Sequence, residues 1–334
     1  MYYEPYKRGR DRAGGGRRGL GCVPRLAWFL VKTVAKIAIL LVILAVIAYA
    51  LPPSLFLVEP EADLGIAADL PNDCVNILLL GVDALNSGSQ RSDTIMILSV
   101  GYNTVRLTSI LRDCVVEIEG HGSTKINAAY AYGGAELAMR TVNSNFGMNI
   151  TKYVVVDFLT LARLIDAVGG VDVVVSQEEM RHVNYNNRAV AYSEQSEELL
   201  GYKPQALQEY SQDGETPVHL DGLQALGFAR IRKLDSDFGR TTRQREVFAA
   251  ALTSMRKNAA NPLMYARLIK VLLEDVKTNL GYVEIVSMAM KALVCGEVEQ
   301  LRLPVADSYT DNGSRITIDT GKNAQALRLF IYGQ

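Results

Sequence analysis

Two aspartates stand where a pair of carboxylates could bind a cation. Asp83 closely follows the predicted strand 75–80, and Asp93 directly precedes the predicted strand that begins at Thr94. A carboxylate at the end of a buried strand projects into the crevice where ligands of open α/β sheets bind. Joined by the loop 84–90, the two carboxylates could hold one Mg²⁺ ion, which takes oxygen ligands and completes its shell with phosphate and water. The alternative is that both aspartates cap turns, the commoner role of Asp beside Ser and Thr.

Guanidinium groups are unusually dense between residues 230 and 245. The stretch contains Arg230, Arg232, Arg240, Arg243 and Arg245, together with Asp237 and Gln244. A helix is predicted over 241–257, which places Arg240 beside a helix N-terminus, where free N–H groups and the macrodipole attract anions. Cations at this end oppose the dipole unless an anion is bound, so the stretch favours a phosphate site over a solvated helix face. For Gln244 the structural alternative is a capping box with Thr241.

Two further cations follow the predicted strand 106–111. Arg112 comes directly after this strand, and Lys125 lies a short distance further along the chain. Both side chains would add positive charge to the crevice that holds the aspartates, which would strengthen its attraction for an anion. The alternative is a surface ion pair with Asp113 or Glu119.

The elements that must position these residues alternate between strands and helices. Continuous apolar runs predict strands, and apolar residues at helical spacing predict helices. Strands are expected at 75–80, 94–100, 106–111, 153–156, 171–175, 298–303 and 315–319, and helices at 135–145, 160–167, 221–228, 241–257, 262–277, 282–293 and from 323. This alternation predicts a single three-layer α/β/α domain with a central mixed sheet over residues 75–334. The polar stretch 176–218 has little periodicity and is expected to be an insertion at the rim.

The first 74 residues have a different composition. Residues 1–25 contain seven basic and two acidic residues and predict a cytoplasmic tail, and the apolar segment 26–51 is long enough for a transmembrane helix. The proline-containing segment 52–74 predicts an extended stalk. This order of segments predicts a single-pass protein of the cell membrane, with its N-terminus in the cytoplasm and its domain outside. The alternative is a cleaved signal peptide ending near 48–50.

Charge and composition exclude several classes of protein. The chain has 35 basic and 36 acidic residues and is 49% hydrophobic, an ordinary globular composition that excludes a disordered protein. From residue 37 onward, acidic residues exceed basic residues by eight. An exported acidic domain is not expected to have nucleic acid as a partner.

The cysteines give little sign of a disulfide framework or a zinc site. Cys74, Cys114 and Cys295 belong to the predicted exported part, and an odd number cannot all be paired. Cys74 and Cys114 are the pair that could form a disulfide, and the alternative is that they are buried free thiols.

Several short motifs occur in an order that resembles a known family. They are 76–83 (NILLLGVD), 91–94 (RSDT), 111–113 (LRD), 125–128 (KINA), 168–173 (VGGVDV), 220–222 (LDG), 230–232 (RIR), 237–241 (DFGRT) and 243–245 (RQR). Over residues 75–334 the chain resembles the LytR-CpsA-Psr family of Gram-positive cell-envelope proteins. It departs from the family at Leu111, where Pro is usual, and at 84–85, where Ser-Arg is often found.

The resemblance implies an extracytoplasmic phosphotransferase. It would move a glycopolymer, of the teichoic acid or capsule type, from a polyprenyl-pyrophosphate carrier to a sugar hydroxyl of peptidoglycan. Carried over to this chain, the resemblance implies that Asp83 and Asp93 hold Mg²⁺ and that Asp237 supports the site or acts as a base. The implied catalytic residues are these three aspartates and Arg240. The implied pyrophosphate-binding residues are Arg112, Lys125, Arg230, Arg232, Arg240 and Gln244.

The carrier also needs an apolar groove for its prenyl tail. The segments 154–158, 161–167 and 263–273 could line that groove, although each could simply be core. Two alternative functions remain open: hydrolysis of the same pyrophosphate by water, and non-catalytic binding of a polyprenyl lipid by a regulator of envelope assembly.

Overall fold

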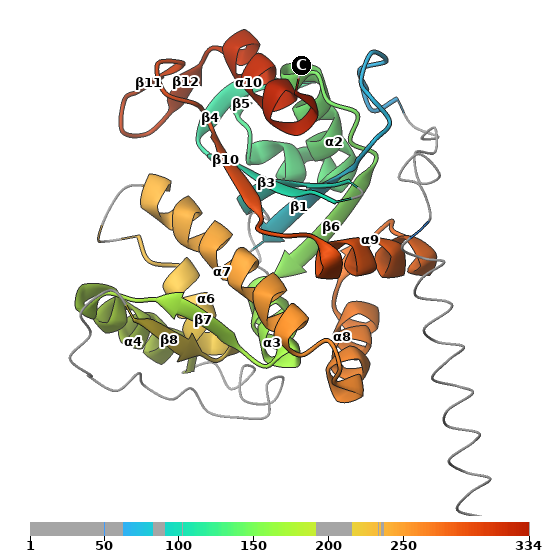
Figure 1. Ribbon diagram of the computed structural model, residues 1–334. Helices are drawn as coiled ribbons and strands as arrows, with labels where there is room; N and C mark the ends of the chain where they lie inside the picture. The colour runs from blue at the N-terminus through green and yellow to red at the C-terminus, as the bar shows by residue number, and fades with distance from the viewer. Residues whose placement is uncertain are drawn as a thin grey trace, which may run out of the picture. The chain divides into compact units, whose positions relative to one another are not determined.

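The computed structural model describes residues 50, 63–82, 91–101, 103–191, 216–232, 234 and 237–333 (Figure 1). All of them belong to the compact unit formed by residues 48–334. The predicted tail 1–25, nearly all of the predicted transmembrane segment 26–51, and Asp83 lie outside the described residues. Of the helices that are described, none has both the length and the hydropathy required to cross a membrane.

A mixed sheet forms the centre of the unit. Its strands are β1 (Val75–Val82), β2 (Ser92–Val100), β3 (Val105–Ile110), β6 (Lys152–Asp157), β9 (Lys277–Thr278) and β10 (Glu299–Leu303). They are hydrogen-bonded in the order β10-β3-β2-β1-β6-β9. The pairs β1–β6 and β10–β3 are parallel, and the other three pairs are antiparallel. The prediction of a central mixed sheet is therefore confirmed.

Helices cover both faces of this sheet. The described helices are α2 (Ala128–Phe146), α3 (Phe158–Val168), α4 (Gln177–Ala191), α6 (Gly222–Ala229), α7 (Asp237–Lys257), α8 (Pro262–Glu274), α9 (Tyr282–Val294) and α10 (Thr320–Tyr332). Figure 1 shows α2 and α10 on one side of the central strands and α3, α7 and α8 on the other.

The alternation of side chains along β1 explains this arrangement. Leu78 and Leu80 pack in one core cluster with Phe146 of α2 and Leu327 of α10. Ile77 points to the opposite face of the strand and packs with Met288 of α9 in a different cluster. A strand that is apolar on both faces must be covered on both faces, which gives the α/β fold that the sequence predicts.

Two smaller sheets flank the central one. The first contains β4 (Cys114–Ile118), β5 (Gly122–Lys125), β11 (Tyr309–Asp311) and β12 (Ile316–Ile318), and the second contains β7 (Val171–Val174) and β8 (Pro217–Leu220). The predicted strands at 171–175 and 315–319 therefore exist, but outside the central sheet. In β7 the reason is visible: Val171 and Val173 are buried while Asp172 and Val174 are exposed, so only one face can be covered.

The predicted polar insertion begins with a helix that the sequence pattern does not reveal. Within the part of α4 whose side chains are described, Met180 and Val183 pack in a core cluster that also contains Phe228 of α6. The polar residues around these two give the segment too weak a periodic signal to predict a helix. Residues 192–215 of the insertion lie outside the described residues.

The end of the predicted stalk packs against the domain. Leu64 is 4% exposed, and its carbonyl oxygen accepts a hydrogen bond of 2.9 Å from Nδ2 of Asn143 in α2. Arg328 of α10 pairs with Asp69 at 3.1 Å. The prediction of a stalk up to residue 74 is therefore wrong for residues 63–74, because one buried leucine and these polar contacts fix them to the domain.

The two cysteines that could have formed a disulfide are free thiols. Cys74 and Cys114 are both buried. Burial raises the pKa of each thiol to about 12, so both are protonated at neutral pH. The alternative of buried, unpaired thiols is the one that the structure supports.

Candidate active site

Four charged residues from separate segments meet at one end of the central sheet. Asp93 is the second residue of β2, Arg112 follows β3, Arg232 follows α6, and Arg240 lies in the first turns of α7. Oδ1 of Asp93 lies 2.5 Å from Nη1 of Arg112, and Oδ2 lies 2.9 Å from Nη2 of Arg232. Nη2 of Arg240 donates to the backbone carbonyl oxygen of Asp93 at 3.3 Å. Asp93 is thus the point where three arginines converge.

These arginines keep Asp93 ionised. Burial alone would raise the pKa of its carboxyl group. The positive charges of Arg112, Arg232 and Arg240 outweigh this effect and hold the pKa below its usual value of 3.8. The carboxylate therefore stays negatively charged throughout the physiological pH range.

Asp237 makes a second junction between the same arginines. One of its carboxylate oxygens accepts a hydrogen bond of 2.9 Å from Nη2 of Arg240 and lies 3.2 Å from Nε of Arg112, an ion-pair distance without hydrogen-bond alignment. Asp237 is also the first residue of α7, where a negative charge complements the helix dipole.

The prediction that α7 begins at Thr241 is wrong by four residues. The Thr241 hydroxyl donates to the backbone carbonyl oxygen of Phe238 at 2.9 Å, a contact made from inside the helix rather than from its cap. The proposed capping box of Thr241 and Gln244 therefore does not form. Asp237 supplies the negative charge at the helix start that the predicted boundary lacked.

Arg240 combines deep burial with unpaired donors. Its side chain is 2% exposed, and two of its nitrogens, Nε and Nη1, have no hydrogen-bond partner among the described residues. Burial lowers the pKa of the guanidinium to about 10, so the group is still charged at neutral pH. A buried cation with unsatisfied donors is costly unless an anion binds to it.

Lys125 joins this group of charges through Asp113. Nζ of Lys125 lies 2.7 Å from Oδ1 of Asp113, and Oδ2 of Asp113 lies 3.5 Å from Nε of Arg112. The predicted alternative of an ion pair with Asp113 is thus confirmed, and the pair is part of the larger group. We call this group the arginine–aspartate cluster; its members are Asp93, Arg112, Asp113, Lys125, Arg232, Asp237 and Arg240.

The two remaining predicted anion ligands, Arg230 and Gln244, lie at an adjacent pocket. The chain leaves α6 at Arg230, and the guanidinium carbon of Arg230 lies 4.4 Å from the centre of the Phe158 ring. Oε1 of Gln244 is buried without a hydrogen-bond partner among the described residues. Both side chains line the pocket together with Thr94, which follows Asp93 in β2. The pocket therefore lies next to the arginine–aspartate cluster.

The pocket is almost entirely apolar. Its volume is about 250 Å³, and its walls come from β1, β2, β6, α3, α6, α7 and α8. All three segments predicted for a prenyl groove contribute to it, for example through Val156, Leu164 and Leu268. The further lining residues include Leu79, Met96, Leu161, Val247, Phe248, Ala251, Leu252 and Met255. A long apolar chain with an anionic end would match this pocket and its charged border.

Arg243 and Arg245 have structural partners instead of a place in the cluster. Nε of Arg243 pairs with Oε1 of Glu179 in α4 at 2.8 Å, and its Nη1 donates to the carbonyl oxygen of Ile231 at 3.3 Å. Arg245 contacts the Ser109 hydroxyl of β3 and Gln300 of β10. These contacts fix α7 and the backbone between Arg230 and Arg232. Glu179 is 64 residues away from Arg243, so no local sequence signal could have identified it.

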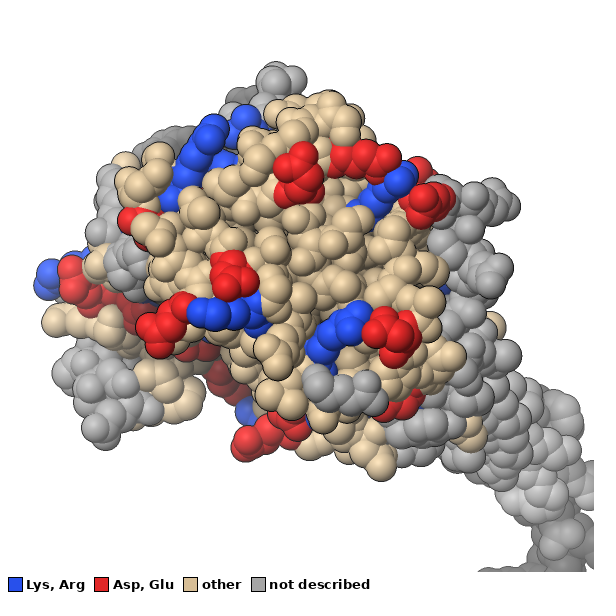
Figure 2. Space-filling model, turned by 90° about the horizontal axis from the view of Figure 1, so that it is seen from above, with Lys and Arg blue, Asp and Glu red and all other residues tan. Residues whose placement is uncertain are grey.

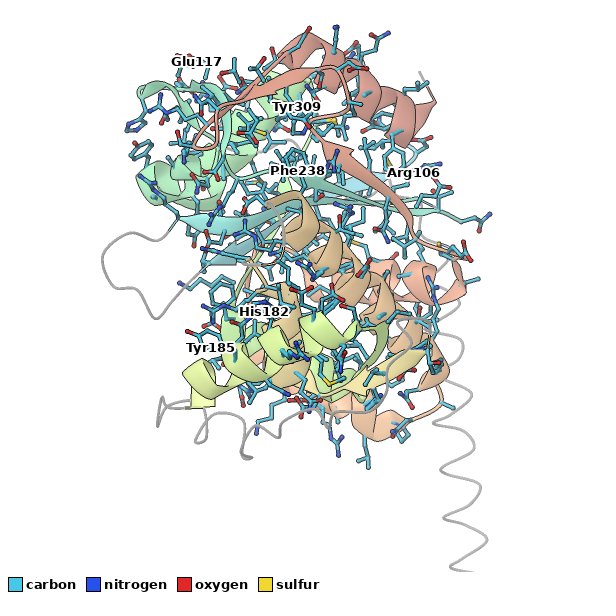
Figure 3. All side chains as sticks on the ribbon, turned by 90° about the vertical axis from the view of Figure 1, so that its left-hand side faces the viewer. Arg106, Glu117, His182, Tyr185, Phe238 and Tyr309 are labelled. Atoms are coloured by element: carbon cyan, nitrogen blue, oxygen red, sulfur yellow. The ribbon has the colours of Figure 1, made fainter. Side chains whose placement is uncertain are left out.

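An aromatic contact also holds the first turn of α7 in place. The rings of Phe238 and Tyr309, both labelled in Figure 3, have centres 5.5 Å apart, and the Arg302 guanidinium lies 4.5 Å from the Phe238 ring centre. Phe238 thus anchors the start of α7, next to Asp237, on the four-stranded sheet of β4, β5, β11 and β12.

The described oxygen ligands fit a magnesium ion in part. Asp93 is ionised, and each of its oxygens keeps a lone pair beside the arginine that it contacts. Its predicted partner Asp83 lies outside the described residues. No group of three or more His, Cys, Asp or Glu side chains suited to a metal occurs within the part of the chain that the structure describes. A metal there would have to take its other ligands from Asp83, water and a bound phosphate.

On the face seen in Figure 2, basic and acidic side chains are interspersed on a mostly uncharged surface. This face has no broad basic patch of the kind that tracks a nucleic-acid backbone. Four cations do lie close together in the partly buried arginine–aspartate cluster.

The fold and the site define an α/β protein with a partly buried cluster of arginines and aspartates beside an apolar pocket. A family model described as the LytR_cpsA_psr family matches residues 59–328, and the chain belongs to this family. Its similarity to the regulatory protein MsrR of Staphylococcus aureus (strain COL) is 29% identity over 272 residues, which covers 77% of this chain and 74% of MsrR.

A transferase and a solved structure are also similar. TagU of Oceanobacillus iheyensis is a polyisoprenyl-teichoic acid–peptidoglycan teichoic acid transferase; it is 40% identical over 190 residues, 54% of this chain and 51% of TagU. The structure of TagT with bound octaprenyl pyrophosphate matches with a TM-score of 0.56 and 22% identity, over 83% of this chain and 94% of TagT. That match shows that the two proteins share a fold.

Proposed function

We propose that this protein transfers a glycopolymer from a polyprenyl-pyrophosphate carrier to a peptidoglycan sugar hydroxyl. The observation that carries the proposal is Arg240, a buried guanidinium with two nitrogens that have no hydrogen-bond partner among the described residues, four residues before Gln244, which lines the apolar pocket. A polyprenyl pyrophosphate has the matching chemistry, because it joins a long apolar tail directly to two charged phosphates. The name of TagU and the lipid bound to TagT support the same substrate class.

Formal charges support a pyrophosphate diester as the ligand. The four cations and three carboxylates of the arginine–aspartate cluster leave one net positive charge, which favours an anionic ligand. A pyrophosphate esterified at both ends carries two negative charges. Its oxygens would accept from the unpaired nitrogens of Arg240 and from Arg112 and Arg232, with the prenyl tail in the pocket past Arg230 and Gln244.

In the proposed reaction the acceptor hydroxyl oxygen attacks the sugar-side phosphorus. A bond forms between these two atoms, the bond from the phosphorus to the bridging oxygen breaks, and polyprenyl phosphate leaves with the electron pair. The hydroxyl proton can pass to the leaving phosphate, whose second pKa is about 6. The anhydride supplies the driving force, so the residues need only position the groups and neutralise charge on the phosphate oxygens.

Asp237 is better suited to orient the arginines than to act as a base. One of its oxygens contacts both Arg112 and Arg240, which fixes the direction of both guanidinium planes. Asp93 holds Arg112 and Arg232 in the same way. We propose that Mg²⁺, held by Asp83 and Asp93, supplies further neutralisation of the phosphate charge when it is bound.

We also propose the cellular setting that the sequence predicts. The segment 26–51 would anchor the protein in the cell membrane as a single pass, with the tail 1–25 in the cytoplasm and the domain outside. Both the carrier lipid and peptidoglycan are accessible to a domain on that side.

Purified full-length protein in detergent can be given a polyprenyl-pyrophosphate-linked glycopolymer and a peptidoglycan oligomer. We expect mass spectrometry to find the oligomer with the polymer attached through one phosphate, and EDTA to abolish this product. Free polymer phosphate that forms equally without the oligomer would identify a hydrolase. Bound lipid without turnover, with or without Mg²⁺, would identify a binding protein and overturn the proposal.

A further inference from the structure

Large apolar side chains are exposed mainly on two consecutive helices. Of the twelve large hydrophobic residues that are exposed in the described chain, seven lie on α8 and α9, with exposures between 49% and 74%. They are Leu263, Ile269, Leu273, Tyr282, Val283, Val286 and Val294. Exposed apolar residues normally occur singly, so this concentration in 26 helical residues makes α8 and α9 candidates for an interaction surface.

Helix α8 is apolar on more than the face that it buries. Met264 and Val271 are buried, and Leu268 lines the apolar pocket. Ile269 and Leu273 lie on the solvent side, where a helix of a soluble domain usually carries polar residues. The helix therefore separates the pocket from an apolar outer surface.

The charges near this surface are of two kinds. Three of its acidic groups are held in ion pairs: Glu284 pairs with Lys152 at 2.6 Å, and Glu274 and Asp275 both pair with Arg163. The exposed cations Arg267, Lys270 and Lys277 have no ion pair among the described residues. An apolar surface flanked by unpaired cations matches a bilayer that contains anionic phospholipids.

We propose that α8 and α9 form a docking face that lies on the lipid bilayer beside the prenyl pocket. Twelve residues, 51–62, connect Ala50, in the predicted transmembrane segment, to Asp63, where the continuous described chain begins. Even fully extended, they reach about 40 Å, so the domain stays close to the membrane. Each helix has 13 residues, too few to cross a bilayer but enough to lie along its surface.

This docking deepens the proposed function, on which its biological meaning rests. A polyprenyl lipid resides in the bilayer, and Leu268 and the exposed Ile269 are adjacent residues on α8. Docking would bring the wall of the pocket to the membrane surface, so that the tail could pass from bilayer to pocket with little exposure to water.

Tryptophan fluorescence in proteoliposomes can locate the docking face. The full chain contains a single tryptophan, Trp28, so Trp28→Phe gives a background without signal. Ile269→Trp on α8 and Val283→Trp on α9 report on the face. Leu329→Trp on α10 is the matched control, because Leu329 and Val283 are 59% and 60% exposed. In Figure 1, α10 is at the top of the molecule and α8 near its lower end.

In vesicles of phosphatidylethanolamine and phosphatidylglycerol, we expect both reporters on the face to be blue-shifted and to lose at least half of their intensity when brominated lipids are included. The control should change little, and Arg267→Glu with Lys270→Glu should reduce the quenching at position 283. Quenching equal to the control at either reporter would overturn the proposal. A blue shift that brominated lipid does not quench and that disappears on dilution of protein in lipid would assign the face to a second copy. None of these signals needs turnover, so failure of the transferase assay would leave them unchanged.

Discussion

The arginine–aspartate cluster and the apolar pocket share helix α7 and strand β2 but are built on different principles. In the cluster, each charged side chain is held by a partner of opposite sign, and Asp93 alone contacts three arginines. In the pocket, many apolar side chains contribute small and similar contacts. A single substitution should therefore disable the cluster, whereas the pocket should fail only when its volume is filled.

The largest effect is expected for Arg240→Met, which tests the arginine–aspartate cluster. This substitution removes the two unpaired donors that we assign to the pyrophosphate. We therefore expect kcat/KM to fall about 10²- to 10³-fold, the usual effect of removing one preorganised donor to a reacting oxyanion. The melting temperature should change little, because the buried guanidinium is only partly paired. Transfer assays and thermal melts on the same preparation measure both.

Arg256→Met is the control for this change. Arg256 lies in the last turn of α7 and donates to the carbonyl oxygen of Ala292, far along the helix from Arg240. Its replacement should leave kcat/KM within about twofold of the original protein. If both variants lose the same activity, the unpaired donors of Arg240 have no special part in the reaction.

The next effect is on stability and concerns the contact that fixes α7 to α4. Glu179→Gln removes the negative charge that contacts Arg243 at 2.8 Å, and because the Arg243 side chain is only 7% exposed, the free energy of unfolding should fall by about 2 kcal/mol. Glu178→Gln is a matched control, since Glu178 is exposed and lies in the same first turn of α4. Denaturant melts that give equal losses would assign the effect to the helix dipole instead of the ion pair.

The pocket can be tested by filling it. Ala251→Phe places a ring in the pocket and should weaken binding of a long-chain polyprenyl pyrophosphate about tenfold, while a short-chain analogue binds as before. Ala249→Phe is the control on the same helix, because Ala249 lines a polar groove on another face of α7. The affinity of both variants for both lipids can be measured by titration. If the prenyl tail lies elsewhere, Ala251→Phe and Ala249→Phe will lose the same affinity for the long-chain lipid.

The sequence predicts the cluster better than it predicts the helix boundaries around it. The sequence predicts that Asp93, Arg112 and Arg240 lie close together, because each stands near the end of a strand or the start of a helix at the same edge of the sheet. The sequence pattern predicts the start of α7 four residues too late, because Thr241 and Gln244 have the spacing of a capping box. Local patterns of this kind cannot show that Asp237 begins the helix through its contacts with arginines from other segments.

Contacts between distant segments account for the remaining differences. The packing of Leu64 on Asn143 and the ion pair of Glu179 with Arg243 each join residues more than 60 positions apart. The separation of β7 from the central sheet likewise depends on which strand it meets, and in the structure that strand is β8. Period and propensity describe one element at a time, so such partners are known only once the chain is folded.

The smallest expected effect is a change in the pH dependence of stability, and it separates a buried ion pair from an exposed one. Because the arginines lower the pKa of Asp93, this group stabilises the folded state above its unfolded pKa of about 3.8, and the stabilisation is lost as the pH falls through the folded value. The melting temperature of the original protein should therefore exceed that of Asp93→Asn at pH 6, and the two should converge below about pH 3.8. Asp69→Asn is the control: Asp69 also pairs with an arginine, Arg328, but its side chain is 70% exposed. Solvent screens that pair, so its replacement should shift the melting temperature far less at every pH. Equal shifts for the two variants would show that burial adds nothing to the hold of the arginines on Asp93.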